Sequence, residues 1–231
     1  MILGIDASNI RAGGGVTHLI NILTSIGTDT RKYDFSRVIV WGGKDTIEKL
    51  PEREWLDLRT INKLNNSRFQ RVLWLFFGLS AKARAANCDV LLIPGGLYFG
   101  NFRPYIAICQ TLLPFEYNEV ARYGFSARTL RLIALRFGQS KTFSNSNANI
   151  FLSHYAEELV SKIKGVKNIP RKIIHHGAKV NFMGKIKKQN IESDKIQLLY
   201  VSTIDLYKHQ WNVIAAVAKL RKEGINAHLT L

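Results

Sequence analysis

Residues 1–26, MILGIDASNIRAGGGVTHLINILTSI, contain the unit from which the fold is built. Residues 2–6 form a short apolar run ending in a carboxylate, which is typical of a buried strand, and three glycines follow at 13–15. After the glycines, apolar residues recur at helical spacing, at Val16, Leu19, Ile20, Leu23 and Ile26. A strand, a glycine loop and an amphipathic helix in this order predict an α/β fold.

The same alternation of apolar runs and helical segments continues along the chain. Further strands are expected at 37–41, 58–62, 89–93, 105–109, 149–152 and 172–175. Helices are expected at 68–86, 115–122, 126–137 and 154–163, the last of them capped by Ser153. This order predicts a parallel sheet covered by helices on both faces, as in Rossmann-like domains.

Residues 181–195 are rich in lysine and polar side chains and poor in apolar ones, which indicates a linker. After it we expect a strand at 196–201, a helix at 208–220 with Asp205 available as its cap, and a strand at 226–231. The expected organisation is therefore an N-terminal domain at 1–180, the linker, and the first β-α-β unit of a second Rossmann-like domain at 196–231. Because one such unit leaves apolar side chains uncovered, the second domain is expected to be truncated.

Charge and composition limit the classes of partner. The chain has 33 Lys and Arg against 17 Asp and Glu, so its formal net charge is 33 − 17 = +16, which attracts nucleic acid, anionic lipid or diphosphates. Cys88 and Cys109 lie in apolar contexts, which predicts neither a disulfide framework nor a zinc site and fits a reducing compartment. The chain starts without a signal-peptide pattern, and its longest nearly apolar run, 72–79, is too short to span a bilayer. A cytoplasmic location is expected.

Two segments are candidates for anion binding. Gly13, Gly14 and Gly15 stand between a strand and a helix start, where free amides and the helix dipole favour a phosphate or a sugar carboxylate. His18 occupies the third glycine position of the dinucleotide fingerprint, so no NAD site is expected, and a plain tight turn is an equal alternative. Lys208 stands where a strand opens into a helix; it is either a phosphate-binding cation or a solvated first-turn lysine.

Motifs for metal and covalent chemistry give no candidate. The sequence has no D-x-D and no H-x-x-x-H, so no metal site and no cofactor are predicted. His175 and His176 are neighbours on an expected strand and point to opposite faces, which favours one core histidine and one at the strand end. No G-x-S-x-G elbow is present, and neither cysteine lies beside a histidine or a helix start.

Basic residues gather around aromatic ones in two helical segments. One holds Arg128 and Arg131 near Leu135, and the other holds Trp74, Phe76 and Phe77 between basic flanks. Solvated helix faces around core aromatics are the alternative, but the net charge favours an anionic membrane surface. Nucleic acid is not expected as a partner, because no RRM-type or OB-type motif interleaves these charges with aromatics.

Several segments together resemble the retaining, family-four type of GT-B glycosyltransferases. They are GGG at 13–15, ICQTLLP at 108–114, IFLS at 150–153, KIIHHG at 172–177 and LYVSTIDLYK at 199–208. The last is similar to the family's V-G-R-L-x-x-x-K-G motif, with Ser202-Thr203 in place of Gly-Arg and Lys208-His209 in place of Lys-Gly. Gln110 stands where the family commonly has a histidine that contacts the donor sugar.

The resemblance implies metal-independent transfer of a sugar from a nucleotide-sugar donor to a polysaccharide or lipid-linked acceptor in cell-surface polysaccharide synthesis. It implies that Gly13, Gly14, Gly15 and Lys208 bind the donor diphosphate, that Lys208 acts in catalysis, and that Gln110 contacts a sugar or the acceptor. The family's E-x7-E motif would lie beyond Leu231. The alternative is a catalytically inactive truncated product, or a non-catalytic partner that binds membrane or acceptor. Work at the inner face of the cytoplasmic membrane is expected.

Overall fold

The computed structural model describes residues 1–26, 33–62, 64, 68–177 and 195–231. These residues form two compact units, one of Met1–Phe115 and Arg131–His176 and the other of Glu116–Leu130 and Gly177–Leu231. The expected linker at 181–195 lies almost wholly outside the described residues, so the domain boundaries remain a prediction. The segment Glu116–Leu130, which we assigned to the first domain, groups with the second unit.

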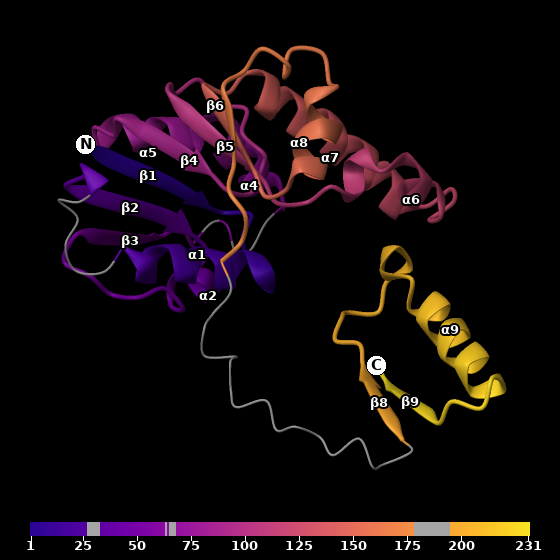
Figure 1. The fold of residues 1–231 in the computed structure, drawn as a ribbon. Helices are drawn as coiled ribbons and strands as arrows, with labels where there is room; N and C mark the ends of the chain where they lie inside the picture. Colours follow the sequence, from indigo (N-terminus) through magenta and orange to yellow (C-terminus); the bar gives the residue numbers. More distant parts are fainter. Residues whose placement is uncertain (27–32, 63, 65–67, 178–194) are drawn as a thin grey trace. The chain divides into compact units, whose positions relative to one another are not determined.

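The first unit is built on a seven-stranded parallel sheet with the order β3-β2-β1-β4-β5-β6-β7 (Figure 1). Its strands are β1 (Ile2–Ala7), β2 (Arg37–Gly42), β3 (Leu56–Thr60), β4 (Val90–Ile93), β5 (Tyr105–Cys109), β6 (Ala148–Phe151) and β7 (Arg171–Ile173). The predicted α/β class and parallel sheet are therefore confirmed, although β3 begins two residues before its expected start at Leu58.

Helices connect these strands, and buried side chains cover both faces of the sheet. The helices are α1 (Gly14–Ser25), α2 (Lys44–Ile47), α4 (Arg68–Leu73), α5 (Leu79–Ala85), α6 (Tyr117–Ala121), α7 (Ala127–Ser144) and α8 (His154–Ser161). Along β2, Val38 and Val40 join one core with α1, whereas Ile39 and Trp41 join another with α5 and α7. Alternate residues of a strand point to opposite faces, so these two cores are the two covered faces of the sheet.

The helix expected at 68–86 is interrupted in the middle. A π-helical segment, η2 (Trp74–Gly78), separates α4 from α5. Trp74 is buried and donates from Nε1 to Oδ1 of Asp6 at 3.2 Å. A Cβ on Gly78 would lie 2.6 Å from the Trp74 ring, so only glycine leaves this ring its place. The interruption therefore accompanies a contact between helix and sheet that helical periodicity does not encode.

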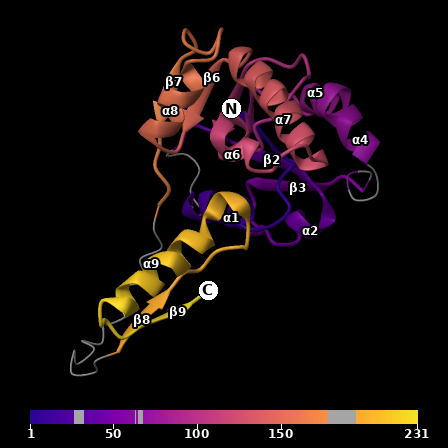
Figure 2. The ribbon, with the colours of Figure 1, turned by 90° about the vertical axis from the view of Figure 1, so that its right-hand side faces the viewer.

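The second unit contains one β-α-β unit (Figure 2). Its elements after residue 195 are β8 (Ile196–Leu199), the short 3-10 helix η5 (Leu206–Lys208), α9 (Gln210–Lys222) and β9 (Ala227–Thr230). The strands β8 and β9 are parallel, as in the first unit of a Rossmann-like domain. Trp211 and Ile214 on α9 are exposed, whereas Val217 is buried.

Two local predictions have opposite outcomes. Ser153 is confirmed as the cap of α8, because its Oγ accepts from the amide of Ala156 at 3.1 Å. The interpretation of one core histidine in the 175–176 pair is wrong, because both His175 and His176 are exposed. The strand β7 ends at Ile173, so both histidines follow it.

Candidate functional site

The sheet changes its winding direction between β1 and β4. The chain leaves β1 through α1 towards β2 on one side, and leaves β4 towards β5 on the other. In open α/β sheets, ligands bind in the crevice outside the carboxyl ends of the strands at such a point. The loops after β1, β4 and β5 all leave from this edge.

A cavity of about 240 Å³ lies at this crevice, and we refer to it as the switch-point cavity. Its lining residues are Asn9, Ile10, Arg11, Ala12, Gly15, Pro94, Gly95, Gln110, Thr111 and Gln139. Arg11 is the charged member of this set, and its guanidinium donates to the carbonyl of Leu64 at 2.9 Å. The rest of the polar lining is neutral, with three carboxamides and one hydroxyl, which suits a ligand that carries hydroxyl groups.

Gln110 reaches the cavity from the end of β5. Its Nε2 donates to Nδ1 of His18 at 3.0 Å, and a Cβ on Gly15 would lie 3.5 Å from its Oε1. The His18 ring meets the His176 ring edge to face with centroids 4.5 Å apart. Burial, and then repulsion from His176, lower the pKa of His18, so the neutral ring can accept the amide hydrogen. The structure thus brings Gln110 and Gly15 to one cavity. Their positions in the sequence did not predict that they would lie together.

The glycine loop forms the amino end of α1. Gly13 has φ +67°, and its carbonyl accepts from the amide of Val16 at 3.1 Å to begin the helix. No side chain caps α1, and a Cβ on Gly13 or Gly14 would have nothing within 4 Å among the described residues. The start of this 12-residue helix is therefore exposed and has no side-chain cap, which suits an anion. Gly13 and Gly14 are exposed and do not line the cavity, whereas Gly15 does.

Asp6, at the end of β1, is a site-forming residue that sequence analysis did not identify. It is fully buried, and its Oδ1 accepts from the amide of Ser8 at 3.1 Å and from Trp74. Burial raises the pKa of Asp6 against the lowering effect of these hydrogen bonds. The carboxyl group therefore fixes the start of the loop that carries Asn9. A carboxylate at the end of an otherwise apolar strand was the available signal.

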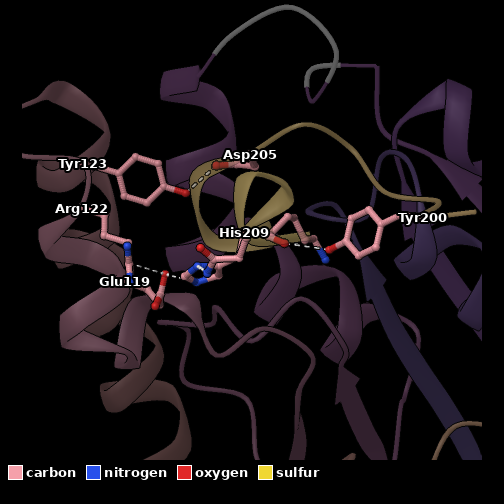
Figure 3. Close-up of polar contacts among 8 residues, drawn as sticks. Glu119, Arg122, Tyr123, Tyr200, Asp205 and His209 are labelled. Carbon is pink, nitrogen blue, oxygen red and sulfur yellow. Dashed lines mark hydrogen bonds and ion pairs between the residues drawn. The ribbon is translucent and has the colours of Figure 1, made fainter. Parts of the chain in front are cut away.

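Lys208 ends η5 in the second unit, and its backbone is held on two sides (Figure 3). Tyr200 donates from its hydroxyl to the Lys208 carbonyl at 2.7 Å, and the Lys208 amide donates to the carbonyl of Asp205 at 3.0 Å. Its ammonium lies 4.8 Å from the centre of the Tyr207 ring. Within the described part of the chain this ammonium has no carboxylate partner, so it remains available for an anion.

Asp205 does not cap the helix as expected. Its side chain makes no cap hydrogen bond; instead it accepts from the Tyr123 hydroxyl at 2.5 Å and pairs with Arg128 (Figure 3 shows the Tyr123 contact). Burial would raise the pKa of Asp205, but the hydrogen bonds from Tyr123 and Arg128 outweigh it and lower the pKa. Competition from two stronger donors in the 116–130 segment explains the missing cap.

The two cysteines have no reactive surroundings. Both are buried and unpaired, and burial raises the pKa of Cys88 to about 11 and that of Cys109 to about 12. These thiols stay protonated near neutral pH and are therefore poor nucleophiles.

No protein-family model and no curated protein matches the chain. Solved structures do match the chain, among them the two that follow. Sucrose-phosphate synthase from Thermosynechococcus elongatus matches with a TM-score of 0.64 and 14% sequence identity. The match covers 99% of this chain and 61% of the synthase chain. HepE from Anabaena, solved in complex with UDP and glucose, matches with a TM-score of 0.52 and 17% sequence identity. The match covers 99% of this chain and 59% of the HepE chain.

Both neighbours are glycosyltransferases of the GT-B fold, and at these identities the likeness concerns the fold. The chain has the α/β, Rossmann-like architecture of that class and spans about three fifths of the length of each neighbour. Among the described residues, no helix combines the length and the apolar character needed to cross a bilayer.

Proposed function

We propose that the protein is a glycosyltransferase of the retaining, family-four type, which transfers a sugar from a nucleotide-sugar donor to a glycan acceptor. The observation that carries the proposal is the switch-point cavity, neutral and rich in carboxamides, directly beside an uncapped glycine-rich helix start. The cavity suits a sugar, and the helix start suits a phosphate group. The similarity to two sugar-transferring enzymes supports the same class of reaction.

In this proposal the chain stabilises the departing nucleoside diphosphate electrostatically. As the bond between the sugar and the diphosphate breaks, negative charge grows on the phosphate oxygens. That charge is stabilised by the amides of Gly13, Gly14 and Gly15 and by the ammonium of Lys208. Preorganised donors of this kind often account for a large part of an enzyme's rate enhancement. Gln110 contacts the sugar from the end of β5. No metal and no cofactor are part of the proposed reaction.

The donor side is tested by the affinity of the 231-residue chain for UDP, measured by calorimetry. We expect Lys208→Ala to weaken UDP binding about 10-fold to 100-fold, because a charge-assisted contact contributes about 1.5–3 kcal/mol. Lys222→Ala is the matched control, since Lys222 is an exposed lysine at the other end of α9. Equal affinities of the wild type and Lys208→Ala would make Lys208 a solvated lysine only.

We further propose that the acceptor is lipid-linked and that the enzyme works in cell-surface polysaccharide synthesis at the inner face of the cytoplasmic membrane. The first unit exposes an aromatic surface, which consists of Val72, Leu73, Phe76, Phe77, Ile133 and Phe137. Phe76 stacks on Phe99 at 4.9 Å, and a Cβ on Gly138 of α7 would lie 3.0 Å from the Phe99 ring. Phe99 therefore links the two helical parts of this surface.

The charge around this surface favours an anionic membrane. Within the first unit, helix α7 carries Arg131, Arg136 and Lys141 and has no acidic residue, whereas Arg128 near its start pairs with Asp205. Phe77 and Phe137 are 69% and 72% exposed, which is unusual for large aromatics unless they meet an apolar partner. Each basic residue near an anionic leaflet contributes about 1 kcal/mol, and the aromatic rings supply apolar burial.

Vesicle binding tests the membrane part of the proposal. We expect the chain to sediment with vesicles that contain anionic phosphatidylglycerol at low salt, and to be released as salt screens the charges. The double substitution Phe77→Ser and Phe137→Ser should weaken binding about 10-fold or more, because it removes two large exposed rings. Tyr155→Ser, at an exposed aromatic outside the surface, is the control. Equal binding to neutral and anionic vesicles would contradict the proposal.

A further inference from the structure

The geometry points to Gln139 as a specificity-determining residue, whose Oε1 accepts a hydrogen bond from a hydroxyl of an uncharged sugar in the switch-point cavity. Gln139 lies on α7, lines this cavity and is only 4% exposed. Its Oε1 is buried and has no hydrogen-bond partner among the described residues. The inference rests on the proposed function and names the kind of sugar group that the site recognises.

An unpaired buried oxygen is uncommon in a folded protein. Nearly all buried polar atoms find a partner, because losing hydrogen bonds to water without a replacement destabilises the fold. Gln139 belongs to α7 and Asn9 to the loop after β1, and both line this cavity. An unpaired acceptor at the wall of a polar cavity is best explained by a ligand that supplies the missing donor.

The surroundings hold Gln139 in place. A Cβ on Gly96 would lie 3.1 Å from Nε2 of Gln139, and Gly96 has φ +67°, so a side chain there would strain the backbone and press on the amide. One turn further along α7, the Thr142 hydroxyl accepts from the amide of Tyr98 at 2.9 Å. The loop after β4 is thereby fastened to α7 one turn from Gln139, and its Gly96 packs closely against the Gln139 amide.

The chemistry of the cavity favours a neutral sugar over an acidic one. Asn9, Gln110 and Thr111 offer amide and hydroxyl groups, and no carboxylate is part of the lining. One N–H of the Arg11 guanidinium donates to the Leu64 carbonyl, and the side-chain oxygen of Gln139 can only accept. An acceptor oxygen repels a carboxylate or phosphate but binds a hydroxyl. Polar groups built to bind a hydroxyl discriminate strongly against a ligand that lacks it.

The test is binding of glucose, galactose, mannose and N-acetylglucosamine to the full chain, followed by ligand-observed NMR. We expect at least one of them to bind with a millimolar Kd, and Gln139→Met to weaken that binding about 10-fold, since methionine keeps the length but not the acceptor. Gln210→Met is the matched control. Gln210 is also buried, but it lies in the second unit and its Nε2 donates to the carbonyl of Thr203 at 2.8 Å. This control should leave sugar binding unchanged.

Deoxy analogues of the sugar that binds make the test specific. One analogue lacks the hydroxyl that faces Gln139, and the wild type should bind this analogue about 10-fold more weakly than it binds the parent sugar. The wild type and Gln139→Met should bind the analogue with equal affinity. In urea unfolding without sugar, Gln139→Met should be at least as stable as the wild type, because no internal hydrogen bond is lost, whereas Gln210→Met should be less stable.

Three results would overturn the inference. They are the absence of binding by all four sugars, an equal response of every deoxy analogue in both proteins, and a loss of stability in Gln139→Met as large as in Gln210→Met. The last result would mean that Gln139 serves the fold through water. These failures differ from failure of the proposed function, because UDP binding and its dependence on Lys208 are measured separately.

Discussion

Nε2 of His209 lies 3.1 Å from Oε2 of Glu119, and the same carboxylate oxygen pairs with Arg122 (Figure 3). His209 begins α9 with φ +55°, a left-handed conformation that favours glycine. In the resembled motif a glycine follows the lysine, and here His209 does. The chain therefore keeps the backbone turn after Lys208 but gives it a side chain that reaches the 116–130 segment.

A double-mutant cycle on His209 and Glu119 measures this contact. His209→Gly should lose the pair with Glu119 but also relieve about 1 kcal/mol of left-handed backbone strain. Because the two effects oppose each other, the net change in the free energy of unfolding should be small. In the background of Glu119→Ala, the same change should be stabilising. We expect a coupling of about 0.5–1 kcal/mol from urea unfolding. Strictly additive effects would show that the two side chains do not interact in solution.

Gly96 and Gly124 form a matched pair of positive-φ glycines. Their φ angles are +67° and +56°, but a Cβ would meet Gln139 at Gly96 and nothing within 4 Å at Gly124. Gly124→Ala should cost about 1 kcal/mol of stability from the backbone alone, and Gly96→Ala should cost clearly more. Thermal unfolding of the two variants checks the difference. If both lose the same stability, the close packing of Gly96 on Gln139 is not present.

Stability should depend on pH through His18. Burial and the neighbouring His176 lower its pKa in the folded protein below the unfolded value of about 6.5. The unfolded chain then binds more protons just below that value, so stability falls as the pH drops through this window. We expect His18→Gln, and to a lesser extent His176→Gln, to reduce the fall between pH 7.5 and 5.5, as measured by urea unfolding. Parallel curves for the wild type and both variants would refute this role.

Asp6 predicts a pH dependence of the opposite sign. Its pKa is raised in the folded protein, so stability falls as the pH rises from the ordinary value of an aspartate through the folded pKa, where the folded chain still holds a proton that the unfolded chain has lost. Asp6→Asn keeps an oxygen for the Ser8 amide and Trp74 but carries no charge. The variant should be more stable than the wild type at pH 7, with the gain shrinking towards pH 3. A variant that is less stable at every pH would argue against a buried charge.

The elements that sequence analysis located well are those with a local signal. The strand expected at 105–109 matches β5, since its apolar run is short and lies between Pro104 and Gln110. Ser153 was found because capping depends on residues three apart. The interruption at Trp74 and the partners of Asp205 were missed, because both depend on residues more than 65 positions away.

The candidate site was predictable to the same limited extent. The glycine loop and Lys208 carry motifs, and Gln110 was named through the family resemblance. Gln139 was not found, because a glutamine within a helix gives no sign of whether its amide will be buried. Its place at the cavity follows from the packing of α7 against the loop after β4, which is a property of the folded chain.

The central proposal is that this chain binds a nucleotide sugar, with the glycine loop and Gln110 of the first unit and Lys208 of the second unit as binding residues. Amide chemical-shift mapping of the full chain during a titration with UDP-glucose tests it most directly. The account predicts that the amides of Gly13–15, Gln110 and Lys208 shift together with one millimolar or tighter Kd, and that Lys208→Ala weakens that Kd. Saturable shifts confined to other residues, or no shifts at millimolar UDP-glucose, would contradict it.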